Sequence, residues 1–127
     1  LNLPDFKHKA TVRLPVSLLR EAVQDLLKIS DEAKMIAELS EFTIEAKSET
    51  SAGKIKFTSF CQEMMIEVDD PPVEALYSLE WLDKLSKALG KIGDDVTIRF
   101  TDNKPVELAA CYYPCLDVKA ILAPRVR

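Results

Sequence analysis

The sequence predicts an α+β fold in which two amphipathic helices pack on one face of antiparallel β-sheets. Two stretches, residues 15–30 and 77–92, repeat apolar side chains with the period of an α-helix. The segments around them alternate apolar and polar residues with a period of two, as strands do. Each helical stretch has one apolar stripe, so we expect both helices to cover the same face of the sheets.

The helix expected over residues 77–92 has two chemically different faces. At about 100° per residue, one face collects five apolar side chains, Leu79, Leu82, Leu85, Leu89 and Ile92. Lys84, Lys87 and Lys91 form a stripe on the opposite side. Ser78 is placed to cap the helix, because its hydroxyl can accept a hydrogen bond from an amide in the first turn. The lysines either serve an external anionic partner or are solvated near the helix C-terminus, where the helix dipole favours cations.

The helix expected over residues 15–30 begins at Pro15, an accepted residue at a helix N-terminus. Its inward face is predicted to hold Leu19, Ala22, Val23 and Leu26. Arg20, Gln24 and Lys28 recur every fourth residue on the outside, beside Glu21 and Asp25. Taken alone, that outer face is mixed in charge and is interpreted as a solvated surface.

The expected strands give the order β-α-β-β-β-β-α-β-β-β, a strand–helix–three-strand unit that occurs twice. They cover residues 7–14, 34–39, 42–47, 54–60, 63–68, 73–77, 95–101, 106–112 and 117–122. The four strands from 34 to 68 are expected to form one antiparallel meander with a buried face. The segments 63–68 and 73–77 count as one strand region, interrupted at Asp69–Pro72. Lys54 and Lys56 alternate with apolar residues, a pattern that also suits an edge strand.

The composition restricts the classes of function. At 127 residues the chain fits one domain with a sizeable core. A net charge of −4 argues against a generally basic nucleic-acid binder, so any contact with nucleic acid must come from a local stripe. Three glycines exclude a glycine-rich phosphate loop. No apolar run approaches the roughly 20 residues of a membrane span, and the start has no signal-peptide pattern, so no membrane partner is expected.

Catalytic and metal-binding residues are not grouped in any recognisable pattern. Cys111 and Cys115 have no second Cys or His pair to complete a zinc site, and with Cys61 they are expected to be free thiols in a reducing compartment. His8, the single histidine, has no Ser, Cys or carboxylate partner at a catalytic spacing. We therefore expect a protein without a cofactor, a metal or an enzymatic activity.

Several short motifs, spread in order from Val12 to Val126, give the chain a family resemblance. They are Val12–Pro15, Gly53–Phe57, Tyr77–Leu79 with Trp81-Leu82, Lys87-Ala88, Val96–Ile98, Lys104–Val106 and the terminal Leu122–Val126. With them the chain resembles the C-terminal domain of DNA sliding clamps of the proliferating cell nuclear antigen family, most closely the archaeal members. The resemblance implies the DNA-clamp fold. It assigns residues 7–127 to the clamp domain and residues 1–6 to the end of an interdomain connector.

In that family, two such domains are joined by a connector, and three chains close a ring of six domains around duplex DNA. This chain holds one domain, and we expect it to be an excised C-terminal domain rather than a half-length clamp protein. The resemblance implies a ring-shaped processivity factor for DNA replication and repair. It would lie in the cytoplasm with the nucleoid if archaeal, or in the nucleus if eukaryotic.

The resemblance implies that both helices line the central hole and face the phosphates. The DNA-facing residues would be Arg20, Gln24, Lys28, Lys84, Lys87 and Lys91. Three lysines on phosphates would give a salt slope of only about −2.7, enough for loose, sequence-blind attraction inside a closed ring. Family members often carry basic residues where this chain has Glu21 and Gln24, so the contribution of the first helix to DNA contact is open.

Two further surfaces follow from the resemblance. A pocket for client peptides would use Pro105, Ile121, Ala123, Pro124, Arg125 and Val126. Its clients would be DNA polymerase, the clamp loader, and enzymes of the flap endonuclease and ligase type. The edge that pairs with another clamp subunit would use Lys54, Ile55, Lys56, Phe57, Thr58 and Ser59. Without the partner domain, the chain is not expected to form the normal ring.

Two functions therefore stand at this point. The first is a sliding clamp that encircles duplex DNA and tethers replication and repair enzymes. The second is a clamp-like interaction or regulatory domain that never encircles DNA. The basic helix stripe discriminates between them, because a pure adaptor has no need of it.

Overall fold

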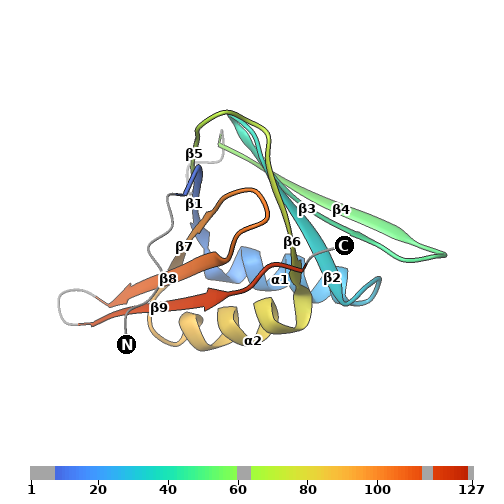
Figure 1. The fold of residues 1–127 in the computed structure, drawn as a ribbon. Helices are drawn as coiled ribbons and strands as arrows, with labels where there is room; N and C mark the ends of the chain where they lie inside the picture. The colour runs from blue at the N-terminus through green and yellow to red at the C-terminus, as the bar shows by residue number, and fades with distance from the viewer. Residues whose placement is uncertain (1–7, 60–63, 113–115, 126–127) are drawn as a thin grey trace.

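The computed structural model describes residues 8–59, 64–112 and 116–125 (Figure 1). The proposed connector end at residues 1–6 lies outside them. Within these ranges the elements are β1 (Ala10–Pro15), α1 (Val16–Leu27), β2 (Glu32–Ala37), β3 (Glu41–Lys47), β4 (Ala52–Thr58), β5 (Met65–Val68), β6 (Val73–Ser78), α2 (Leu79–Gly90), β7 (Asp95–Phe100), β8 (Val106–Tyr112) and β9 (Leu116–Leu122). The α+β class predicted from the sequence is confirmed.

The strands form two antiparallel sheets, and the two helices pack against each other beside them (Figure 1). One sheet has the order β5-β1-β7-β8-β9 and the other β4-β3-β2-β6. The meander that follows α1 is extended by β6, the strand that leads into α2. The meander that follows α2 is extended by β1, the strand that leads into α1. This exchange of strands builds the twice-repeated strand–helix–three-strand unit into one domain.

Backbone hydrogen bonds at the helix starts place α1 and α2 antiparallel. The amide of Val16 donates to the carbonyl of Asp94, just beyond the end of α2, at 2.8 Å. The amide of Leu79 donates to the carbonyl of Asp31, just beyond the end of α1, at 2.9 Å. Ser78 caps α2 as predicted, since its hydroxyl accepts from the amide of Trp81 at 3.3 Å. The start of each helix is thus held next to the end of the other.

The core fills the space between the helices and both sheets. The predicted inward residues of α1, Leu19, Ala22, Val23 and Leu26, are all buried. On α2, Leu79, Leu82 and Leu89 are buried, while Leu85 and Ile92 are half-buried against the core.

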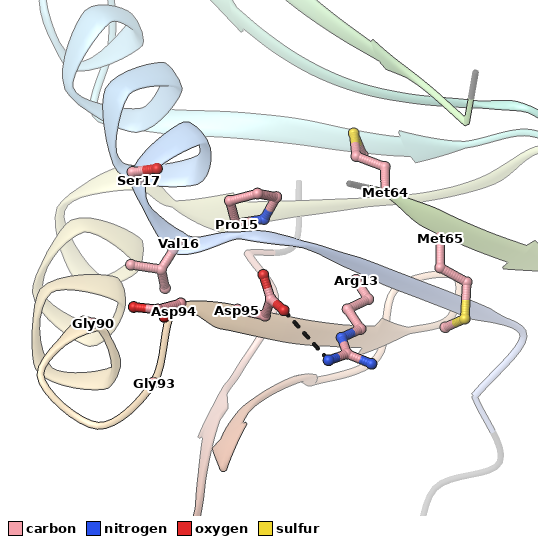
Figure 2. A pocket seen from close by; sticks show the side chains of 10 residues that line it. All are labelled: Arg13, Pro15, Val16, Ser17, Met64, Met65, Gly90, Gly93, Asp94 and Asp95. Carbon is pink, nitrogen blue, oxygen red and sulfur yellow. Dashed lines mark hydrogen bonds and ion pairs between the residues drawn. The ribbon is translucent and has the colours of Figure 1, made fainter. Parts of the chain in front are cut away.

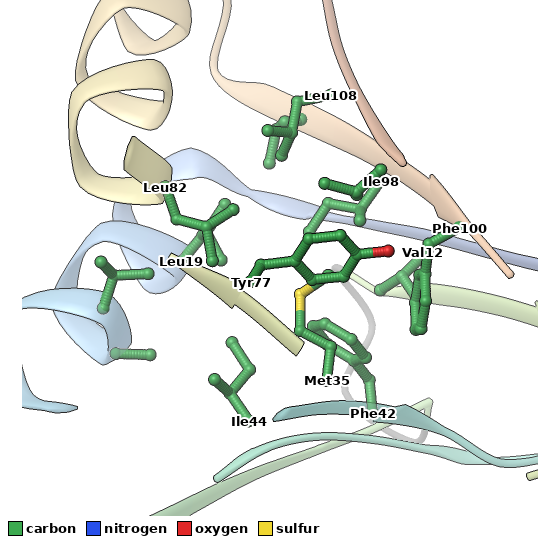
Figure 3. Packing of buried hydrophobic residues seen from close by; sticks show 14 of the residues in the cluster. Val12, Leu19, Met35, Phe42, Ile44, Tyr77, Leu82, Ile98, Phe100 and Leu108 are labelled. Carbon is green, nitrogen blue, oxygen red and sulfur yellow. The ribbon is translucent and has the colours of Figure 1, made fainter. Parts of the chain in front are cut away.

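Tyr77 lies where the two sheets meet. Its ring sits among Met35 and Phe42 of the four-stranded sheet and Ile98 and Phe100 of the five-stranded sheet (Figure 3). It meets Phe100 edge-on, with ring centroids 6.4 Å apart and planes at 89°. The Tyr77 side chain therefore connects the two sheets through the middle of the core.

The prediction of a four-stranded meander from residue 34 to residue 68 was wrong. β2, β3 and β4 form a meander, but β5 leaves it and pairs with β1, where Val12 faces Ile66. β5 and β6 are separate strands in different sheets and do not form one interrupted region. The chain changes sheet at Pro71 and Pro72, which have no amide hydrogen to continue a ladder. Alternation of polar and apolar residues predicts a strand but does not specify its partner.

Candidate nucleic-acid and partner surfaces

The outer face of α2 presents Lys84, Lys87 and Lys91, all exposed. Lys84 is already engaged: its Nζ lies 3.3 Å from Glu80 and 4.8 Å above the centre of the Trp81 ring. Trp81 itself is 52% exposed. Among the described residues, Lys87 and Lys91 have no carboxylate within ion-pair distance. These two lysines are therefore the ammonium groups of α2 that are freest to meet an external anion.

The outer face of α1 is less basic than that of α2. Gln24 and Lys28 are exposed, and the Lys28 Nζ lies 3.9 Å from Asp25. Arg20 is only half-exposed, and its buried Nε finds no hydrogen-bond partner among the described residues. The Arg20 side chain is therefore less exposed than those of Gln24 and Lys28. Because α1 and α2 lie side by side, the exposed cations of both helices belong to one side of the domain.

Residues expected to form the peptide pocket lie together at one end of the β8–β9 pair, where β8 begins and β9 ends. Val106 pairs with Leu122 and Glu107 with Ile121, which places Pro105 beside the segment that follows β9. Pro105, Ile121 and Pro124 are half-buried, and Ala123 is exposed. Val126 lies outside the described residues. The structure thus places four of the six residues that the resemblance assigned to this pocket, Pro105, Ile121, Ala123 and Pro124, at this end of the β8–β9 pair.

Arg125 contacts residues of its own domain through both its backbone and its side chain. Its amide donates to the carbonyl of Leu76 in β6 at 2.8 Å. Its guanidinium lies 3.6 Å from Asp31 and 3.4 Å from Glu32. The side chain is therefore directed back to carboxylates of its own chain, a feature that no local sequence pattern signals.

β4 is an edge strand, as its lysine pattern predicted. It pairs with β3 on one side and is the outermost strand of its sheet. Lys54 and Lys56 are exposed, and Lys56 lies 3.4 Å from Glu41 of β3. Ile55, Phe57 and Thr58 are half-buried, as is Ser59 just beyond the strand. The strand therefore offers a free backbone edge flanked by charged side chains.

A cavity of about 650 Å³ that sequence reasoning missed lies beside the junction of β1 and α1 (Figure 2). Pro15, Met64 and Met65 contribute apolar walls, and Arg13 and Asp95 form an ion pair across it at 3.3 Å. Its lining comes from three separate stretches of the chain, residues 13–17, 64–65 and 90–95, so no linear motif could indicate it. The charged side chains of its lining are Arg13, Asp94 and Asp95, so the lining carries one more negative than positive charge.

The described residues contain no group of three or more His, Cys, Asp or Glu side chains arranged for a metal ion. Cys61, Cys115 and the side chain of Cys111 lie outside the described part, so the predicted free thiols remain a prediction. None of the described helices is long and apolar enough to cross a membrane.

Two antiparallel helices on one side of a pair of strand-exchanged sheets, with exposed lysines on the outer helix face, define a DNA-clamp domain. Residues 2–125 match the family described as proliferating cell nuclear antigen, C-terminal domain. The chain therefore belongs to the C-terminal domain family of proliferating cell nuclear antigen.

Curated relatives and solved structures agree with this assignment. The chain is 35% identical over 127 residues to the DNA polymerase sliding clamp of Thermococcus fumicolans, and 35% identical over 129 residues to that of Pyrococcus abyssi. Each alignment covers 99% of this chain and 50% of the relative, so the chain spans about half the length of these relatives.

Solved structures show the same fold at lower identity. The proliferating cell nuclear antigen of Entamoeba histolytica superposes with a TM-score of 0.88 at 17% identity, covering 99% of this chain and 49% of the other. That of Thermococcus kodakaraensis gives 0.89 at 20% identity, covering 98% and 51%.

Proposed function

We propose that this chain is the C-terminal domain of a DNA sliding clamp subunit. In this role it contributes one arc of a ring that encircles duplex DNA and acts as a processivity factor for DNA polymerase. The observation that carries the proposal is the placement of both helices on one side of the sheets, with Lys87 and Lys91 exposed and unpaired among the described residues. The naming of the curated relatives as DNA polymerase sliding clamps supports it.

The charge arrangement favours sliding over gripping. Lys84 must leave Glu80 and the Trp81 ring before it can meet a phosphate, while Lys87 and Lys91 have no ion-pair partner in the part of the chain that the structure describes. Two phosphate contacts give a salt slope of about −1.8 per domain, far too small for tight binding. Lysines contact the phosphate backbone and carry no base-reading geometry. The attraction is therefore weak and independent of sequence, and closure of the ring is what retains the DNA.

The other two surfaces complete the proposed role. The free edge of β4 suits pairing with a neighbouring clamp subunit through main-chain hydrogen bonds. The group formed by Pro105, Ile121, Ala123 and Pro124 suits an extended client peptide, as carried by DNA polymerase, the clamp loader, and flap endonuclease or ligase enzymes. The protein performs no catalysis in this proposal. It tethers enzymes that do.

Duplex binding at low salt tests the proposal. We expect Lys87→Glu with Lys91→Glu to remove the weak anisotropy change of a labelled duplex, and random duplex sequences to bind equally well. Lys54→Glu with Lys56→Glu is the matched control, because it changes the net charge equally but lies on β4. Equal loss in both double variants would show a nonspecific charge effect and contradict the proposal.

The alternative, a clamp-like adaptor that never encircles DNA, predicts a different outcome. The helix variant would then leave duplex binding unchanged and also leave polymerase stimulation unchanged in a complete ring. The double variant Lys87→Gln with Lys91→Gln removes the two positive charges without adding negative ones. If the clamp proposal holds, its duplex binding should depend less on salt, with the slope smaller in magnitude by about 1.8 because two phosphate contacts are lost.

A further inference from the structure

The segment that follows β9 crosses from one sheet to the other. β9 is the outer strand of the five-stranded sheet, and β6 is the outer strand of the four-stranded sheet. Arg125 reaches β6, where its amide donates to the Leu76 carbonyl at 2.8 Å. Figure 1 shows this end of the chain passing beside β6. The last described residues therefore run from the edge of one sheet, at β9, to the edge of the other, at β6.

The Arg125 side chain adds ion pairs to the backbone hydrogen bond with Leu76. The guanidinium lies 3.4 Å from Glu32 at the start of β2 and 3.6 Å from Asp31 in the turn before it. The Glu32 side chain is only 12% exposed, but Arg125 is 41% and Asp31 76% exposed, so water screens these ion pairs as it does surface pairs and each contributes modestly. The same guanidinium nitrogen, Nη1, lies between the two carboxylates and contacts both of them. The contacts converge on one residue from three positions: Leu76, Asp31 and Glu32.

The residues just before Arg125 have little to hold them locally. β9 ends at Leu122, and Ala123 and Pro124 belong to no strand. Pro124 has no amide hydrogen, so it cannot donate to a ladder. Without the Arg125 contacts, this segment would be anchored at its β9 end alone. Its course past Pro105 therefore depends on the residue that follows Pro124.

We propose that Arg125 is a positioning residue that straps the C-terminal segment across both sheets and so fixes Ala123 and Pro124 in an extended course. This inference rests on the proposed function, in which those two residues face a client peptide. It assigns Arg125 to the clamp domain's own carboxylates, where the family resemblance had placed it among the peptide contacts. A strapped segment is already ordered when a partner strand adds to it, which lowers the entropy cost of binding.

Amide hydrogen exchange measured by NMR on the 127-residue chain tests the strap without any partner. In Arg125→Ala, the amide of residue 125 should exchange about tenfold faster, because opening of the segment is a local event governed by these contacts. Exchange in β8 and in β2 should stay unchanged. Arg125→Lys should fall between the two, because lysine keeps the positive charge but loses the planar guanidinium and its directional N–H donors.

Arg13→Ala is the matched control, because Arg13 forms a comparable exposed ion pair with Asp95 at 3.3 Å on β7. It should leave the exchange of residue 125 unchanged. The charge swap Glu32→Arg with Arg125→Glu should restore part of the protection lost in Arg125→Glu alone.

Two results would overturn the strap. One is exchange at residue 125 within twofold of wild type in Arg125→Ala. The other is faster exchange spread evenly through both sheets, which would mean that Arg125 only contributes global stability. Duplex binding through the helix lysines should be the same in Arg125→Ala and wild type, so failure of the strap and failure of the clamp function are measured separately.

Discussion

The hydroxyl of Tyr77 offers the sharpest test of the core, through the variant Tyr77→Phe. The Tyr77 side chain is fully buried, and its hydroxyl donates to the carbonyl of Lys104 at 2.6 Å. Phenylalanine keeps the ring and its contact with Phe100 but removes the donor. A net loss of about 1 kcal/mol in the free energy of unfolding is expected at neutral pH, the usual value for one hydrogen bond.

This difference should depend on pH in a defined direction. Burial, and secondarily the Asp102 carboxylate, raise the pKa of Tyr77 well above its ordinary value. In the unfolded chain the phenol ionises with a pKa of about 10, whereas in the folded chain it stays protonated at that pH. Above pH 10 the unfolded state therefore binds fewer protons, and wild-type stability falls by up to about 1.4 kcal/mol per pH unit. Tyr77→Phe has no phenol at this position, so its free energy of unfolding does not fall with pH for this reason.

The two proteins should accordingly reach equal stability between about pH 10 and pH 11, and the variant should be the more stable above that range. Denaturant unfolding followed by far-UV circular dichroism, at a series of pH values from neutral to alkaline, gives the difference directly. Other titrating groups are common to both proteins and cancel. A stability difference that stays constant across the whole series would refute the burial of the hydroxyl and its hydrogen bond.

Three further substitutions test separate features. Ser78→Ala removes the cap of α2 and should cost about 1 kcal/mol in thermal unfolding, while Ser78→Gly should cost only a few tenths. Phe100→Ala leaves a cavity between Tyr77 and Phe42 and should cost about 3–5 kcal/mol, seen as a large fall in the denaturant midpoint. Lys56→Ala breaks an exposed ion pair with Glu41 and should change stability by less than about 1 kcal/mol; a larger loss would show that β4 needs this pair.

The helices and most strands could be predicted because their side chains follow a local period. In α2 the spacing of Leu79, Leu82 and Leu89 fixes the buried face, and the same spacing leaves the three lysines in solvent. Lys84 was not predicted to contact Glu80 and the Trp81 ring. Glu80 precedes it by one helical turn, a spacing that stabilises an ion pair, so this engagement had a sequence signal.

The features that escaped prediction depend on contacts between distant parts of the chain. The alternation in β5 is the same whether the strand pairs with β4 or with β1, and only the three-dimensional fold selects β1. The partial burial of Arg20 and the attachment of Arg125 to Asp31 and Glu32 are likewise set by tertiary packing. The peptide-pocket group could be named from the family resemblance, but the direction of the Arg125 side chain could not.

The position of β1 has a consequence for how this domain acquires its structure. β1 is an inner strand, with β5 on one side and β7 on the other. Val12 therefore pairs with both Ile66 and Ile98. During synthesis from the N-terminus, its apolar side chains emerge long before the second of these partners exists. Closure of so non-local a sheet is slow compared with helix formation. The five-stranded sheet can therefore assemble only once β7, near the far end of the chain, has left the ribosome.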